Sequence, residues 1–344
     1  MKKLICSSIE RIPSDWSTWR KVIDREKYRN FDKDRFPSNV EFCSNLENSN
    51  VNNIQILQRI GSASADAEVY KVRFKDMEFA LKLMPRVDNE SERRNRHEIE
   101  TAYEASEYSD YFPLTFAYGY CPETSYYLNL EREISSFIPR AVEYKRVQEM
   151  LNSIDSKIVK KRFESDYRNG MSVNELETKY NLTTTNEKNN IQVDFLISEL
   201  ANGDLGNWMK KSRDIKEWRK ILIDVITGIY YLTVVLNKVH PDLHPGNILI
   251  LKTKNGIKAL IHDFGRCYPT DENIPATYKA TLISFCQEFI SCANTRDDLI
   301  IPREISIIVQ DILKAIQNLT INPTNIKTIY EEIIYPIITN KINF

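Results

Sequence analysis

Alternating apolar and polar residues predict short strands in the first third of the chain. Residues 54–60, 68–74 and 78–84 follow the two-residue period of a pleated strand. The residues between the second and third segments suit a tight turn, so we expect these two strands to form a hairpin. The next stretch, 89–109, changes to helical spacing because its apolar positions recur on one face. A sheet followed by a helix is therefore predicted.

The rest of the chain adds more strands and then a long helical part. A core helix is indicated at 216–237, and helical spacing returns from about residue 278 onward. Asn255 and Gly256 form a strong hairpin signal between the last two strand patterns. We therefore predict an α+β fold. The further strand patterns occur at 112–120, 193–200, 247–250 and 259–262.

Two segments stand apart from this pattern. Residues 1–50 are polar and aromatic and are interpreted as an N-terminal extension, which leaves 51–344 as the main domain. The region 121–190 is long and ends in a polar run, and it is interpreted as a helical insert. No internal repeat is visible.

Composition limits the classes of protein that fit. The chain has 344 residues, of which 42% are hydrophobic, so a substantial core is expected. The formal net charge of -1 gives no global field for nucleic acid or a membrane surface, and no run of about 18 apolar residues predicts a membrane span. The six cysteines form no C-x-x-C pair. We interpret them as reduced thiols, which indicates an intracellular, cytoplasmic protein.

Two segments carry the candidate chemistry, H-P-D-L-H-P-G-N at 240–247 and H-D-F-G at 262–265. Phosphoryl transfer needs a carboxylate to accept the proton of the attacking hydroxyl, and hard oxygens to hold magnesium. Asp242 and Asn247 lie on one compact loop, and the predicted hairpin returns the chain so that Asp263 lands beside it. The alternative is a capped turn followed by an unrelated hairpin.

These segments resemble the catalytic loop and the magnesium-binding Asp-Phe-Gly of the protein-kinase superfamily. The resemblance implies a bilobal fold, with a small sheet-rich N-lobe at 51–200 that contains the insert and a larger helical C-lobe at 201–344. It also implies ATP and Mg²⁺ as cofactors. By this resemblance Asp242 is the catalytic base, Asn247 binds a second metal ion and Asp263 is the main magnesium ligand.

A lysine upstream fits the same resemblance. Kinases place a lysine on the third strand, and F-A-L-K ends at Lys82 on a predicted strand. Lys82 would hold the ATP phosphates as a catalytic and nucleotide-binding residue, although a lone strand lysine is more often a solvated edge residue. Glu98 on the following helix is expected to hold Lys82, with Glu100 as the second choice.

The segment 60–71 resembles a kinase glycine-rich loop in which only one glycine survives. By this resemblance Gly61, Ser62 and Val69 contact the nucleotide. Small residues let backbone amides approach phosphates, but the loop should be stiffer than one with three glycines. The loss of the other glycines is therefore expected to affect the affinity for nucleotide.

The segment 195–205 resembles the kinase strand that meets adenine. Backbone groups near Glu199 and Leu200 are expected to bind the base, and Asp204 is expected to bind the ribose. Asp204 suits a helix N-cap equally well, so both interpretations stay open.

Several features depart from ordinary protein kinases. Pro241 replaces the arginine that normally pairs with a phosphorylated activation loop, and residues 266–277 run quickly toward a helix. The departures resemble those of divergent kinases of large DNA viruses, which would place the protein in the host cytoplasm or the virion. Within the insert, 167–182 resembles a helix-turn-helix, but a plain helical insert is favoured and nucleic acid is not expected as a partner.

We therefore predict a divergent serine/threonine protein kinase that acts on a protein substrate. A small-molecule kinase similar to antibiotic phosphotransferases is one alternative, because the segment after Gly265 is short. A non-catalytic interaction module is the other, because the glycine-rich loop is eroded. The oligomeric state does not follow from the sequence.

Overall fold

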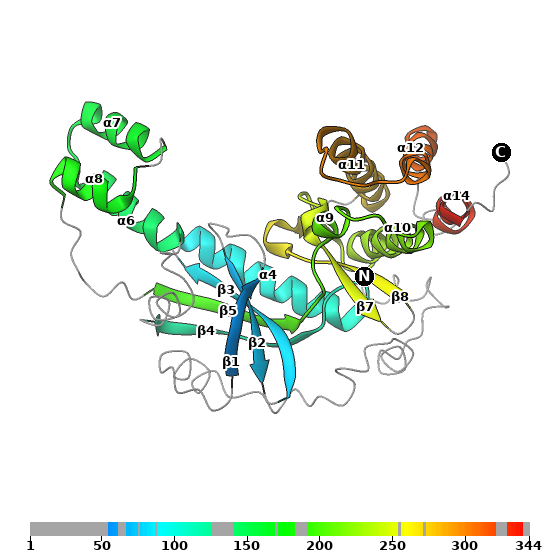
Figure 1. Ribbon diagram of the computed structural model, residues 1–344, viewed down its shortest axis with the longest axis horizontal. Helices are drawn as coiled ribbons and strands as arrows, with labels where there is room; N and C mark the ends of the chain where they lie inside the picture. Colours follow the sequence, from blue (N-terminus) through cyan, green and yellow to red (C-terminus); the bar gives the residue numbers. More distant parts are fainter. Residues whose placement is uncertain are drawn as a thin grey trace. The chain divides into compact units, whose positions relative to one another are not determined.

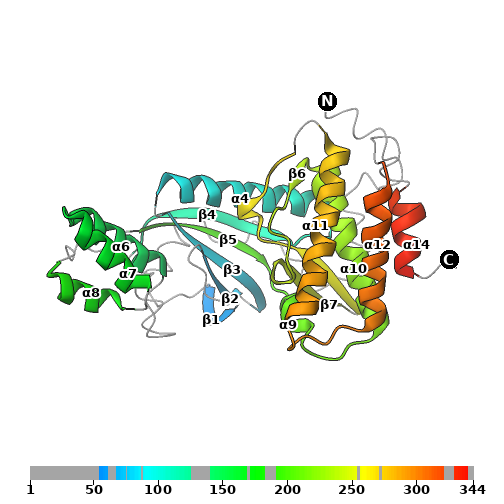
Figure 2. The ribbon, with the colours of Figure 1, turned by 90° about the horizontal axis from the view of Figure 1, so that it is seen from above.

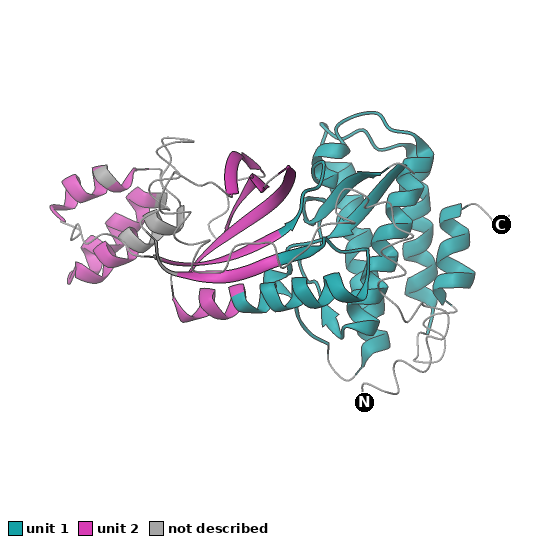
Figure 3. Cartoon of the chain, turned by 90° about the horizontal axis from the view of Figure 1, so that it is seen from below, with its two compact units in different colours: residues 1–33, 96–116, 198–344 teal, residues 34–95, 117–197 magenta. Residues whose placement is uncertain are grey.

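The chain has an α+β fold that divides into two compact units, which alternate along the sequence (Figure 3). Unit 1 comprises 1–33, 96–116 and 198–344, and unit 2 comprises 34–95 and 117–197. The predicted extension 1–50, Gly61 and Ser62 lie outside the described residues. The computed structural model describes residues 54–60, 67–74, 76–86, 88–124, 140–168, 171–182, 191–253, 256–270, 273–320 and 329–339.

A five-stranded antiparallel sheet in the order β1-β2-β3-β5-β4 lies largely in unit 2 (Figure 1). The predicted hairpin is confirmed, since the whole of β2 pairs with residues Met77–Leu83 of β3. β4 begins at Thr115, three residues later than predicted, because Pro113 has no N–H for a strand ladder and Phe112 packs against Phe264. The strands are β1 (Ile54–Ile60), β2 (Glu68–Phe74), β3 (Met77–Arg86), β4 (Thr115–Thr124) and β5 (Ile191–Glu199).

Burial alternates along β3 as the two-residue period requires. Phe79, Leu81 and Leu83 are fully buried on one face, whereas Ala80 and Lys82 are only partly buried on the other. The buried face forms part of the core of unit 2 with the matching residues of β2. Lys82 therefore lies on the face opposite the core.

An ionic network ties together three segments of unit 2. Arg86 at the end of β3 donates from Nε and Nη2 to the two carboxylate oxygens of Asp194 on β5, at 2.8 and 2.6 Å. Asn95 donates to the same carboxylate at 3.1 Å and to the carbonyl of Met84 at 3.0 Å. The Arg86 guanidinium also lies 4.6 Å from the ring centroid of Tyr120. This pairing satisfies the carboxylate of Asp194, which is buried.

Three helices follow β4 and share a separate hydrophobic core within unit 2: α6 (Arg140–Ser153), α7 (Lys157–Arg168) and α8 (Val173–Tyr180). Met150, Phe163 and Leu176, one from each helix, are buried at its centre. Ser172 caps α8 in a capping box with Glu175.

A group of helices forms the core of unit 1, where α10, α11, α12 and α14 lie side by side (Figure 2). Trp218 on α10 is fully buried. The centroid of its ring lies 4.7 Å from the ring centroid of Trp208 and 6.1 Å from that of Phe289. The predicted helix 216–237 is α10 continued by a π-helical turn. The helices are α9 (Leu205–Trp208), α10 (Ile215–Tyr230, π turn Tyr231–Val235), α11 (Ile274–Thr295), α12 (Arg303–Asn318) and α14 (Tyr335–Thr339, after a π turn Tyr330–Ile334).

Two short strand pairs connect these helices. β7 (Ile248–Thr253) and β8 (Gly256–Ile261) form the predicted hairpin, and β6 (Lys238–Val239) pairs with β9 (Tyr268–Pro269). Helix α10 packs on β8 at Gly228, where a Cβ would lie 2.8 Å from Cδ1 of Ile261. The glycine thus allows the helix to approach the hairpin closely.

Two findings bear on the predicted environment of the protein. Cys121 is disulfide-bonded, so the prediction of six reduced thiols is wrong at this position, whereas Cys267, Cys286 and Cys292 are free. Scattered spacing gave no sign of this bond, because pairing depends on which cysteines the fold brings together. Among the described residues, no helix combines the length and apolar character needed to cross a membrane.

Candidate functional site

The hairpin β7–β8 brings the two candidate motifs together in unit 1. Its register pairs Ile248 with Ile261, so Asn247 and His262 emerge at the same end. The N–H of His262 donates to the carbonyl of Asn247 at 3.1 Å, and the His262 ring hydrogen-bonds the carbonyl of Gly246 at 3.1 Å. Asp263 is the next residue, so it leaves the hairpin beside the loop that carries Asp242.

The loop from Asp242 to Asn247 is closed by its own side chains. Asn247 donates from Nδ2 to the carbonyl of Asp242 at 2.8 Å, and its side chain is buried. The N–H of Gly246 donates to Nδ1 of His244 at 3.0 Å, which caps the short helical turn Pro245–Asn247. These bonds fix the loop backbone from within the motif.

His240 joins the loop to the second motif. Its Nε2 lies 3.0 Å from the carbonyl of His262, and a carbonyl only accepts, so Nε2 carries the hydrogen. Burial lowers the pKa of His240, while the backbone of His262 and the charges of Asp263 and Asp242 oppose this shift. The imidazole packs against the Phe264 ring at 6.1 Å. His240 is thus a neutral, buried connection between the two motifs.

Asp263 has an unusual backbone conformation. Its φ of 67° and ψ of 66° lie in the left-handed region, which non-glycine residues seldom adopt. Aspartate tolerates this region better than most residues do. Phe264 follows as a buried residue whose ring packs edge-on against Phe112 at 5.9 Å. Local backbone strain held by surrounding packing is common at functional sites.

The Asp242 carboxylate is open to solvent, with 40% of its side chain exposed. Arg266 donates from Nη1 to its Oδ2 at 3.2 Å. Sequence reasoning did not identify Arg266 as part of the site. The only signal for it is its position directly after the Asp-Phe-Gly motif, and the spacing alone does not show which carboxylate it meets.

The two candidate glutamates on α4 (Asn89–Tyr108) differ in solvent exposure. Glu98 is buried and Glu100 is exposed. Burial raises the pKa of the Cys267 thiol; Lys238 opposes this shift, and the negative charges of Glu98 and Asp263 add to it. The carboxylates of Glu98 and Asp263 therefore both raise the pKa of the Cys267 thiol within unit 1.

A cation on β6 anchors the same helix. Lys238 donates to Oγ1 of Thr101 at 2.8 Å and forms an ion pair with Glu104 at 3.1 Å. Both partners lie on the part of α4 that belongs to unit 1. Lys238 precedes His240 by two residues, so this contact holds α4 next to the start of the candidate catalytic loop. No pattern along the chain indicates this long-range pair.

The segment expected to meet adenine is fixed by several hydrogen bonds in unit 1. The N–H of Glu199 donates to the carbonyl of Leu114 at 2.9 Å, and the Glu199 carboxylate accepts from the N–H of Leu114 at 3.3 Å. Both the N–H and the carboxylate of Glu199 thus bond to Leu114. Asp204 caps α9 by accepting from the N–H of Asn207 at 2.8 Å, so its N-cap interpretation is confirmed and the ribose contact stays a prediction.

Two of the expected nucleotide residues lie together in unit 2. Val69 on β2 and Lys82 on β3 are directly opposite each other in the antiparallel register. Both are partly buried, on the face of the sheet away from Phe79 and Leu81. Directly opposed residues have their Cβ atoms on one side, so the valine and the lysine share a surface.

The donor set in unit 1 suits magnesium. Asn247 uses its amide nitrogen to close the loop, which leaves Oδ1 as the acceptor atom of that side chain. Together with the Asp263 carboxylate this supplies two hard oxygens, and Mg²⁺ is commonly held by one or two protein ligands with phosphates and water. The described residues contain no group of three or more His, Cys, Asp or Glu that could hold a metal ion.

No protein-family model matches the chain, and no curated protein matches it.

Proposed function

We propose that this chain is an ATP-dependent phosphotransferase of the protein-kinase superfamily that phosphorylates serine or threonine hydroxyls of a protein substrate. A bilobal kinase-like arrangement is part of this proposal. The observation that supports it most is the hydrogen bond between the ring of His240, at the start of the first motif, and the carbonyl of His262 in the second, beside a loop that Asn247 closes from within. A capped turn and an unrelated hairpin would not require a side-chain bond between the two motifs.

In this proposal Asp242 accepts the proton of the attacking hydroxyl. The hydroxyl oxygen bonds to the γ-phosphorus of ATP, and the bond from that phosphorus to the bridging oxygen of ADP breaks. Asn247 and Asp263 would hold Mg²⁺, which neutralises charge on the phosphates when bound. Arg266 holds one oxygen of Asp242 and leaves the other for the acceptor. Closing the loop by Asn247 keeps the base in place before substrate arrives.

The remaining predicted residues have supporting roles. Lys82 would bind phosphate oxygens, and Val69 beside it would contact the adenine ring. Glu98 would hold Lys82, and its burial favours it over Glu100 for that role. The carbonyl of Glu199 and the backbone of Leu200 would bind the base. Gly61 and Ser62, which lie outside the described residues, would approach the phosphates.

One observation favours a second candidate function. Only seven residues, 267–273, separate the turn Phe264–Arg266 from helix α11 at Ile274, which leaves little chain for a peptide-docking platform. A short segment of this kind suits a small-molecule phosphotransferase. The third alternative, a non-catalytic module, has no support from the loop assembly, since a purely structural domain does not need an exposed Asp242 carboxylate.

Transfer from γ-labelled ATP to a mixed set of acceptors tests the proposal. Wild-type chain should label protein hydroxyls, and Asp242→Asn should lower the rate by orders of magnitude. Asp214→Asn is a matched control, because Asp214 is an exposed N-cap on α10 and asparagine keeps that cap. Labelling only of small acceptors would support the second candidate. Absence of transfer and of magnesium-dependent nucleotide binding would overturn both.

A further inference from the structure

Helix α7 in unit 2 presents exposed cations around an exposed isoleucine. Lys157, Ile158, Lys161 and Arg162 are all exposed within its first two turns, and we call these four residues the basic face. Lys160 lies in the same turns and is half-buried. Among the described residues, no ion pair includes any of these four cations. The positive charge of the basic face is therefore not neutralised within the described part of the chain.

This distribution of charge opposes the helix that carries it. Lys157 is the first residue of α7, where the helix macrodipole is positive and disfavours cations. Lys157 and Lys161 are like charges four residues apart, a spacing that also destabilises a helix. Helix α8 follows the usual rule, with Glu175 in its first turn and Lys179 in its last. Carboxylates of a partner at the start of α7 would offset both unfavourable effects, and local rules broken without compensation within the fold point to function.

The other side of α7 is fixed by packing. Phe163 is fully buried in the core that α6, α7 and α8 share, with its ring centroid 5.1 Å from that of Tyr180 (Figure 2). The two acidic residues of α7, Glu164 and Asp166, lie in its second half. Asp166 accepts hydrogen bonds from Lys179 at 2.7 Å and from Tyr180 at 2.5 Å. The basic face is thus held on a rigid support, which lowers the entropic cost of binding a partner.

Ile158 adds an apolar contact to the basic face. Its side chain is 69% exposed, the highest value among the exposed large hydrophobic residues of the described chain. Lys161 and Arg162 lie three and four residues further on, so they flank it on the helix surface. A phosphate backbone would match the charges but not the isoleucine, and a membrane surface needs a wider apolar face than one side chain. A protein segment with carboxylates around one apolar residue matches both features.

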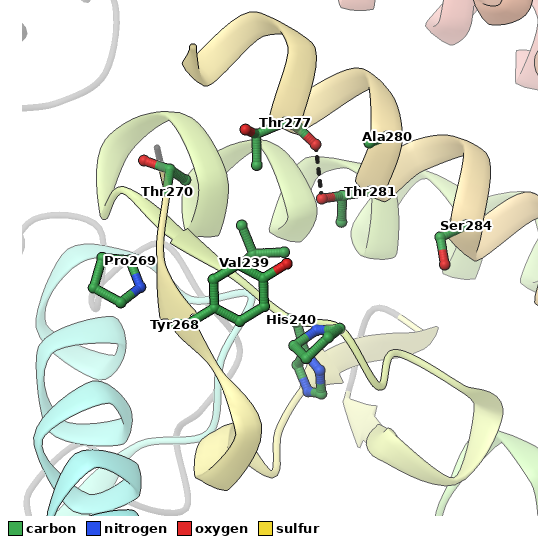
Figure 4. A pocket seen from close by; sticks show the side chains of 10 residues that line it. Val239, His240, Tyr268, Pro269, Thr270, Thr277, Ala280, Thr281 and Ser284 are labelled. Carbon is green, nitrogen blue, oxygen red and sulfur yellow. Dashed lines mark hydrogen bonds between the residues drawn. The ribbon is translucent and has the colours of Figure 1, made fainter. Parts of the chain in front are cut away.

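A cavity of about 630 Å³ beside the candidate catalytic loop lacks these features (Figure 4). His240, the segment 268–270 and one face of α11 line it, and no lysine or arginine is among the described residues of its walls. A carboxylate that entered this space would lose hydration without meeting a lysine or arginine there. Within the described chain, the basic face of α7 therefore suits an acidic segment better than this cavity does.

We propose that the basic face of α7 docks an acidic protein segment that carries a central apolar residue. Aspartate or glutamate side chains of the segment would pair with Lys157, Lys161 and Arg162. The apolar residue would cover Ile158 and remove it from water. This interaction goes beyond the proposed phosphoryl transfer and needs neither nucleotide nor magnesium.

Binding of three fluorescent peptides to the full chain tests the chemistry of the partner. The peptides have equal length and carry a leucine flanked by glutamates, a serine flanked by glutamates, or a leucine flanked by lysines. Anisotropy titration should give the lowest Kd for the leucine–glutamate peptide, a Kd about tenfold higher for the serine peptide, and no saturable binding of the lysine peptide. Equal Kd values for the two glutamate peptides, binding of the lysine peptide, or no binding of the leucine–glutamate peptide would overturn the proposal.

Charge reversal locates the binding site. The double variant Lys157→Glu, Lys161→Glu should raise the Kd of the leucine–glutamate peptide at least about tenfold. Its far-ultraviolet circular dichroism should match the wild type, because glutamate in the first turn is favoured by the macrodipole. Lys211→Glu with Lys216→Glu is the matched control, since both are exposed lysines of unit 1 and change the net charge equally. Equal increases of Kd in the two double variants would contradict a local site.

The variant Ile158→Ser separates the proposed partner from other polyanions. It should raise the Kd of the leucine–glutamate peptide about fivefold and leave that of the serine peptide unchanged. A short DNA duplex and phosphatidylserine vesicles serve as competitors. If either displaces the labelled peptide at a lower concentration than the unlabelled peptide does, the basic face belongs to nucleic acid or to a membrane surface and the proposal is wrong.

The docking site and the proposed function can fail independently. Asp242→Asn should bind the leucine–glutamate peptide with the wild-type Kd, because Asp242 belongs to unit 1 and α7 to unit 2. Peptide binding without phosphoryl transfer would refute the proposed function alone. Asp242-dependent transfer in a chain that does not bind the peptide would refute the docking site alone.

Discussion

The Nδ2 group of Asn247 donates to the main-chain carbonyl of Asp242 at 2.8 Å, so the residue expected to bind metal also closes the loop of the expected base. Asn247→Asp separates these roles, because it keeps an oxygen for the metal and replaces the donor with a second acceptor. We predict that kcat falls about a hundredfold while the magnesium concentration at half-maximal rate changes little. Steady-state rates over a magnesium titration measure both quantities.

Asn247→Ala is the comparison, since it removes both the donor and the oxygen. It should lower kcat and also raise the magnesium requirement. Identical magnesium dependence in the alanine and aspartate variants would argue against a metal-binding role for Asn247.

The buried imidazole of His240 makes stability depend on pH. Burial lowers its pKa below the ordinary 6.5, so below that pH the unfolded chain binds a proton that the folded chain resists. The contribution of neutral His240 to the free energy of unfolding is complete above about pH 6.5. It declines as the pH falls toward the pKa of His240 in the folded state, by up to about 1.4 kcal/mol per pH unit. Urea denaturation at pH 7.5, 6.5 and 5.5 measures this decline.

His240→Gln is the reference for this measurement, because glutamine can still donate to the carbonyl of His262 and does not titrate. We expect the free energy of unfolding of the glutamine variant to fall less steeply with acid than that of the wild type. Other titratable groups are the same in both proteins, so their contributions cancel in the difference. Parallel pH profiles would show that His240 does not set the dependence.

The fold could be predicted well wherever local signals agreed. The spacing of apolar residues indicated β1, β2 and β3, and Asn255-Gly256 indicated the β7–β8 hairpin, whose register alone brings Asn247 and Asp263 near each other. A tight turn and a two-residue period leave few alternatives for which residues face each other. This part of the candidate site therefore followed from nearby residues.

Contacts between distant residues could not be predicted in this way. Lys238 contacts Thr101 and Glu104 across more than 130 positions, and nothing in the sequence distinguishes this lysine from the many others. The disulfide bond at Cys121 was missed for the same reason. Arg266 was missed although it adjoins a motif, because the ion pair with Asp242 depends on the direction in which the chain leaves the turn Phe264–Arg266.

The bidentate pair of Arg86 and Asp194 should be a main determinant of stability in unit 2. Asp194→Asn removes the negative charge and leaves the largely buried guanidinium with only the partly exposed Glu92 as a carboxylate partner. We predict a loss of about 3 kcal/mol in the free energy of unfolding. Amide hydrogen exchange of β3 and β5, together with chemical denaturation, measures this loss for the unit.

Asp166→Asn is a matched control in the same unit, because Asp166 pairs with Lys179 at 2.7 Å on the surface. Water already solvates that pair, so the control should change stability far less. Equal losses in the two variants would show that burial of Asp194 does not determine the effect.

The ion pair between Arg266 and Asp242 should affect catalysis without affecting stability. Both side chains are well exposed, at 65% and 40%, so Arg266→Ala removes a surface pair of little stabilising value. The same change frees the carboxylate to rotate, and we predict that kcat falls about tenfold because the base spends less time in its productive orientation. Arg266→Lys keeps a charge but not the planar guanidinium geometry, so it should recover only part of the rate. Rates that track the free energy of unfolding across the three proteins would instead assign Arg266 a structural role.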